Sequence, residues 1–203
     1  MNMTREGQLT LSTVMLFSLY PQTFFLQLGM IATVIPGVGE GEVGERFLDN
    51  QRIEGNIGDM LEAAIRFVKK NMKNRTIVNP DTGLREDRTE YPVTAIREAV
   101  LNALVHRDYS VHTEGMPIQI QMYENRLEIH NPGGLYGRMS INQLGKMQPD
   151  TRNPVLTTAL EVLNITENRY SGIPTIRCEM SRMGPGAPQF AEEREEFCCS
   201  FVQ

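Results

Sequence analysis

Residues 91–110 have the sequence YPVTAIREAVLNALVHRDYS, which contains the clearest helical pattern of the chain. After Pro92 the apolar residues recur at helical spacing and cover most of the wheel. Three polar residues, Glu98, Asn102 and His106, are each four positions apart and therefore stack in one narrow stripe. The sequence predicts a mostly buried helix, ending near His106, that presents a line of polar groups.

This polar stripe has two interpretations. It could be the solvent side of the helix, or it could line a pocket. In a pocket, the carboxylate of Glu98 and the amide of Asn102 could hold a hydrated Mg²⁺ through oxygen and position a water molecule. For His106, a role in capping the helix end or in packing is favoured over metal ligation.

A predicted β-hairpin supplies a second group of polar residues. Apolar and polar side chains alternate over 118–123 and 127–130, with a tight turn between them. By this period of two, Asn131 lies on the apolar side at the strand end, where its amide could pair with a purine edge. Gly133 and Gly134 then let the backbone approach a ligand closely.

The remaining pattern indicates a two-layer α+β sandwich with a mixed or antiparallel sheet. We expect a strand-rich linking segment over 1–55, packed on a main domain over 56–203. The elements expected outside the central helix and hairpin are strands at 9–19, 24–35 and 197–202, a small hairpin around 77–84, and helices at 57–72, 156–163 and 172–180.

Composition narrows the functional classes. The net charge of −5 provides no general positive field, so direct binding to a nucleic-acid backbone is disfavoured. Of the three cysteines, Cys198 and Cys199 are adjacent, a spacing that suits neither a disulfide framework nor a zinc site. His130 has no partner that the sequence identifies. A reducing, cytoplasmic location is the simplest expectation.

No charged residue occurs from Gly7 to Gly39, and long uncharged apolar runs are typical of membrane-spanning segments. Polar residues and two proline-containing turns, at Pro21 and Pro36, interrupt this run, and no basic stretch of the signal-peptide type precedes it. Buried segments of a soluble protein are therefore favoured over a membrane segment.

Several motifs, in their order, resemble a known family. The 91–110 stretch, RLEIHNPGGL at 126–135, RNPVL at 152–156 and SGIPTI at 171–176 resemble the C-terminal ATPase-like domain of RecG-related transcriptional regulators. That domain is similar to the Bergerat, or GHKL, ATP-binding fold. In addition, LFSLYPQTFFLQL at 16–28 resembles the segment that joins this domain to an upstream Schlafen/AlbA-like domain.

The resemblance implies ATP and Mg²⁺ as ligands and a role for each matching residue. Glu98 would polarise water as a candidate general base, and Asn102 would coordinate Mg²⁺. Asn131 would read adenine, where the wider superfamily has Asp. The other implied ATP-binding positions are Gly133, Gly134, Arg152, Asn153, Ser171 and Gly172.

Three functions remain open at this point. The first is an ATP-binding regulatory module of a transcriptional regulator, which would reach DNA only indirectly, through domains outside this chain. The second is a weak Mg²⁺-dependent ATP hydrolase. The third is a nucleotide-free interaction or dimerisation module, compatible with a homodimer.

Overall fold

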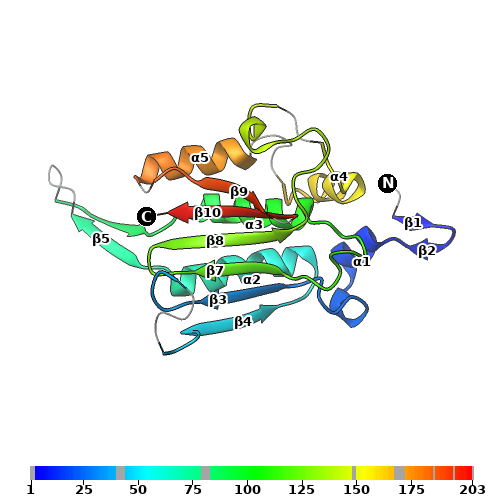
Figure 1. Ribbon diagram of the computed structural model, residues 1–203, viewed down its shortest axis with the longest axis horizontal. Helices are drawn as coiled ribbons and strands as arrows, with labels where there is room; N and C mark the ends of the chain where they lie inside the picture. Colours follow the sequence, from blue (N-terminus) through cyan, green and yellow to red (C-terminus); the bar gives the residue numbers. More distant parts are fainter. Residues whose placement is uncertain are drawn as a thin grey trace.

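The helix expected after Pro92 is α3, Val93–His106, and it packs against a mixed sheet (Figure 1). The computed structural model describes these ranges of the chain: 3–39, 44–78, 83–147, 150–166, 172–184, 186–193 and 195–202. The apolar positions of α3 are buried as the pattern predicts, among them Ile96, Val100 and Leu104.

The sheet has the strand order β4-β3-β7-β8-β10-β9. β3 pairs in parallel with β7, and the other neighbours are antiparallel. In Figure 1, α2 and α3 lie behind this sheet, so the described chain forms a helical layer on a strand layer. The strands are β3 (Met30–Val34), β4 (Asp49–Ile53), β7 (Ile118–Met122), β8 (Arg126–Pro132), β9 (Gln189–Glu193) and β10 (Glu196–Val202). The expected α+β class with a mixed sheet is confirmed.

Alternation along the hairpin explains which side of the sheet meets the helices. Leu127 and Ile129 of β8 are buried, whereas Arg126, Glu128 and His130, which alternate with them, are half-buried. In β10, Cys199 and Phe201 are buried in the same way. Because successive side chains in a strand point to opposite faces, the buried set forms the face that contacts the helices.

α2 and α5 pack against α3, and α1 packs against α2 and α4. α2 (Ile57–Asn71) begins at Asn56, whose side chain accepts a hydrogen bond from the Asp59 backbone amide at 3.0 Å and thereby caps the helix. α5 packs along α3. The remaining elements are α4 (Pro154–Val162), α5 (Gly172–Met183), the 3₁₀ turns Pro21–Thr23 and Ile141–Gln143, and the hairpins β1–β2 (Thr4–Arg5, Gln8–Leu9) and β5–β6 (Asn74–Val78, Arg85–Thr89).

The strand expected over 9–19 is wrong, because this segment forms helix α1, Leu11–Phe17. Leucine and methionine favour helices, and Met15 and Leu16 are the residues of α1 that are buried. The strand expected over 24–35 is only half correct, since β3 starts at Met30. The buried side-chain amide of Gln22 donates a hydrogen bond to Leu28 O at 2.8 Å. This bond holds the residues between Gln22 and Leu28, which precede β3, in a turn.

The division into 1–55 and 56–203 stays a prediction. β3 and β4, from the first segment, extend the same sheet as the strands of the second. Among the residues that the structure describes, no helix is long and apolar enough to cross a membrane.

Candidate functional site

A cleft of about 130 Å³ lies between α3, the start of α5, the end of β8 and the loop that follows β8. Much of its wall is apolar, formed for example by Ala99, Ile129 and Phe197. The polar residues that line it are Asn102, His106, Asn131 and Asp150. The glycines that line it are Gly133, Gly134, Gly145 and Gly172. An apolar cleft with a few converging polar groups is the usual form of a small-molecule site.

Asn131 is the most deeply buried polar residue of this cleft. The alternation of β8 turns it towards α3, and it is only 4% exposed. Its Oδ1 atom has no hydrogen-bond partner within the described chain. A buried acceptor without a partner costs about 1–3 kcal/mol, so its presence in a cleft favours a ligand that donates to it.

Asn102 reaches the same cleft from α3 and lies against the first residue of α5. A Cβ atom added at Gly172 would stand 2.7 Å from Asn102 Nδ2 and 3.0 Å from its Oδ1. Asn102 Nδ2 is also buried without a partner among the described residues. Glycine at 172 therefore lets the amide of Asn102 approach the N-terminus of α5, where free backbone N–H groups attract anions.

Of the remaining predicted residues, Glu98 is placed differently and Ser171 is not described. Glu98 is half-buried one turn before Asn102 on α3, and it is not among the described residues that line the cleft. Ser171 lies outside the described residues.

Arg152 and Asn153 hold the rim of the cleft in place. Arg152 pairs with the Asp108 carboxylate and donates to Gly134 O at 3.1 Å, so it ties the glycine loop to the end of α3. The amide of Asn153 donates to Val105 O and Arg107 O, both at 2.8 Å, and satisfies carbonyls that the helix end leaves free.

Sequence reasoning missed the loop that closes one side of the cleft. Tyr136, Met139 and Leu144 line it from this loop, and Tyr136 stacks with the Arg152 guanidinium at 5.1 Å. The signal was present, because apolar residues recur after the glycine pair in a segment without regular secondary structure. Asp150, which pairs with Arg138, was also missed.

His106 gives the cleft a pH-dependent property. Desolvation lowers the pKa of His106, and the positive charge of Arg152 lowers it further. The folded protein therefore resists a proton that the unfolded chain accepts as the pH falls below about 6.5, the ordinary pKa of a histidine side chain. As the pH is lowered below about 6.5, we expect the free energy of unfolding of the wild type to decrease. In His106→Gln we expect a smaller decrease over the same pH range.

Urea unfolding of both proteins at several pH values measures this difference. His112→Gln, which removes an exposed histidine, is the control. Parallel pH profiles for the wild type and His106→Gln would contradict the assignment.

Comparison with protein families gives one match, which covers part of the chain. Residues 115–201 match the family described as "Putative ATP-dependent DNA helicase recG C-terminal". This range contains Asn131, Gly133, Arg152 and Gly172, but it begins after α3. The match supports a RecG-related ATPase-like domain here and suggests a nucleotide-binding module.

Among the solved structures that match, one is similar over nearly the whole chain. It is the DIP2311 protein from Corynebacterium diphtheriae, with a TM-score of 0.81 and 21% sequence identity. The similarity covers 98% of this chain and 38% of that chain, so this chain spans well under half the length of that protein. At this identity the likeness shows a shared fold. No curated protein matched the chain.

Proposed function

We propose that this chain is an ATP-binding regulatory module of the Bergerat type, working in a cytoplasmic transcriptional regulator. The observation that carries the proposal is the pair of buried, unpartnered amide atoms, Asn102 Nδ2 and Asn131 Oδ1, in the described wall of one cleft. Two such atoms, supplied by α3 and β8 to a largely apolar cleft, suit a ligand with a polar ring edge and a charged tail.

Adenine recognition falls to Asn131 in this proposal. The exocyclic amine of adenine is a donor, and Asn131 Oδ1 is a buried acceptor without a partner in the described chain. Asparagine keeps the acceptor oxygen of the aspartate that the superfamily uses here. Ile129 and Phe197 provide apolar surface for the ring beside it.

Phosphate recognition falls to the start of α5 and the loops beside it. The backbone at Ser171 and Gly172 would offer N–H groups to phosphate oxygens, and Gly133 and Gly134 would allow the opposite loop to approach. Arg152 and Asn153 support this arrangement by holding the loop and the end of α3. When bound, Mg²⁺ would neutralise phosphate charge, with Asn102 as its protein ligand and phosphates and water as the rest.

Binding is favoured over hydrolysis as the function of this cleft. Glu98 is the candidate general base, but the described cleft is lined by Asn102 and not by Glu98. The regulatory role follows from nucleotide occupancy shifting the conformations of a longer protein. In that protein, DNA contact would be indirect, through other domains, and a homodimer is the simplest assembly.

Titrating the intact protein with a fluorescent ATP analogue tests the proposal. We expect saturable binding that Asn131→Leu weakens by about 10- to 100-fold, because the adenine amine loses its buried acceptor. Asn131→Asp should retain binding, since it keeps an acceptor oxygen. The matched control is Asn50→Leu, at an exposed position of β4 far from the cleft.

Each variant is first shown to unfold cooperatively. Folded wild-type protein that binds no analogue, or Asn131→Leu binding as tightly as wild type, would reject the adenine assignment. Mg²⁺ should tighten binding to wild type but not to Asn102→Ala. Phosphate release abolished by Glu98→Gln would instead support the hydrolase function.

A further inference from the structure

The sheet has a second face, opposite to the helices, and it is polar. In Figure 1, α2 and α3 lie behind the strands, and the near face is formed by strands. Along β8, Arg126, Glu128 and His130 are half-buried and alternate with the buried residues that face α3. These side chains therefore project from the sheet on the side away from the nucleotide cleft.

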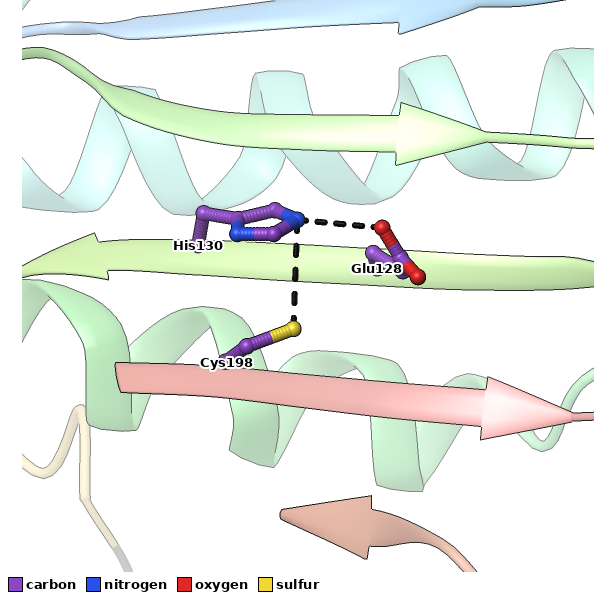
Figure 2. A group of neighbouring side chains, drawn as sticks. All are labelled: Glu128, His130 and Cys198. Carbon is purple, nitrogen blue, oxygen red and sulfur yellow. Dashed lines mark hydrogen bonds and ion pairs between the residues drawn. The ribbon is translucent and has the colours of Figure 1, made fainter. Parts of the chain in front are cut away.

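Three potential metal ligands meet on this face. The antiparallel register of β8 and β10 places Cys198 directly beside His130, and Glu128 is two residues away on the same side. Figure 2 shows Glu128 and Cys198 both directed at the His130 ring. His130 Nε2 lies 3.1 Å from Glu128 Oε2 and 3.8 Å from Cys198 Sγ. One ligand atom from each residue lies within 4.8 Å of the others.

The two separations from His130 Nε2 are close to the edges of a tetrahedral zinc site. Zn–S bonds of about 2.3 Å, with Zn–N and Zn–O bonds of about 2.1 Å, give N–S and N–O edges of roughly 3.6 and 3.4 Å. The measured pairs differ from these edges by about 0.2–0.3 Å, which small side-chain rotations accommodate. These two pairs would thus need little rearrangement of the backbone, and the third pair, Glu128 and Cys198, lies within 4.8 Å.

Each ligand is also oriented by an outer group. Arg126 Nε donates to Glu128 Oε1 at 2.7 Å, which leaves Oε2 for the shared position. The Glu196 carboxylate lies 3.8 Å from His130 Nδ1, the nitrogen that would not bind the metal. Ser200 Oγ is 3.4 Å from Cys198 Sγ. A carboxylate behind a ligating histidine is a typical outer contact of zinc sites.

We propose that Glu128, His130 and Cys198 form a Zn²⁺ site with three protein ligands and a fourth position open to water. Sulfur and imidazole ligands select zinc over Mg²⁺ or Ca²⁺, which prefer oxygen. The two ligand side chains of β8 are 18% and 23% exposed, so they are reachable from solvent yet held by their neighbours. The site is separate from the cleft, because Ile129, Asn131 and Cys199 point to the other side of the sheet.

Cobalt titration of the intact, metal-free protein with a non-chelating reductant tests this site. We expect a sulfur-to-cobalt charge-transfer band in the near ultraviolet and tetrahedral bands in the visible, saturating at one Co²⁺ per chain. Zn²⁺ should displace the cobalt. Cys198→Ser should abolish the charge-transfer band, and Glu196→Gln should weaken binding by about 10-fold through loss of the outer contact.

Matched controls come from the same chain. Cys178→Ser removes an exposed cysteine on α5 and should leave the spectrum unchanged. Wild-type protein without a charge-transfer band, or a band that survives in Cys198→Ser, overturns the proposal. If Cys198→Ser fails to fold, Glu128→Gln decides, because unchanged cobalt affinity there removes the carboxylate from the site and overturns the assignment.

Discussion

Replacing Gly133 with alanine is expected to lower the free energy of unfolding by about 2–4 kcal/mol, through backbone strain and steric conflict. Gly133 has φ of +95°, where an L side chain is disfavoured. A Cβ atom there would stand 2.5 Å from Asp108 Cβ. Asp108 cannot move away easily, because its amide donates to Pro132 O at 2.9 Å and its carboxylate pairs with Arg152.

Chemical denaturation of wild type and Gly133→Ala measures this loss. Gly115→Ala is the control, since a Cβ atom there meets nothing within 4 Å and its residue is exposed. The control should change stability by less than about 0.5 kcal/mol. An equally small change in Gly133→Ala would show that the loop relaxes freely and does not fix the mouth of the cleft.

Replacing Leu104 with alanine is expected to cost about 2–5 kcal/mol, because it leaves a cavity in the centre of the core. Leu104 is 1% exposed on α3, within the apolar cluster that joins the helices to the sheet. The same helix carries Asn102 and His106 to the cleft. Under the proposed function, the loss should also lower the apparent affinity for nucleotide when the protein is close to its unfolding midpoint.

Thermal and denaturant unfolding provide the measurement for Leu104→Ala. Leu19→Ala makes the same chemical change at a residue that is 85% exposed, and it should stay within about 0.5 kcal/mol of wild type. Similar losses for the two substitutions would mean that α3 is not the centre of the cooperative core.

The strongest sequence patterns gave correct elements. α3 has the predicted start and end, because most of its wheel is apolar and Pro92 precedes it. The hairpin of β7 and β8 was also predicted, since one face is buried and the alternation is strict. In both cases one side of the element is buried, so apolar residues recur with the period of that element, about 3.6 residues in the helix and two in the strands.

The errors occur where burial is slight or two-sided. β4 and β9 are edge strands with mostly exposed residues, so neither shows alternation, and neither was predicted. In α1, the apolar run Leu11–Phe17 satisfies both a strand and a short helix, and only its packing decides between them.

The candidate sites divide in the same way. Spacing left the polar stripe of Asn102 open between solvent and a pocket, and the family resemblance implied that Asn102 and Asn131 belong to one site; both line one cleft. Glu98, four residues earlier on the same stripe, does not line it in the described chain. The group of Glu128, His130 and Cys198 was not foreseen, because 68 residues separate His130 from Cys198 and only strand pairing brings them together.

Strand β8 contributes alternate residues to the two proposed sites, Asn131 to the cleft and Glu128 and His130 to the zinc site, so its length is constrained. Adding or deleting a single residue between Leu127 and Gly133 would exchange the two sides of the strand beyond that point. Asn131 would then turn to solvent, and a charged side chain would enter the apolar layer beneath. A substitution in β8 changes one side chain, and a change at a neighbouring position can compensate for it. A shift of the strand by one residue changes every later side chain at once and cannot be compensated in this way.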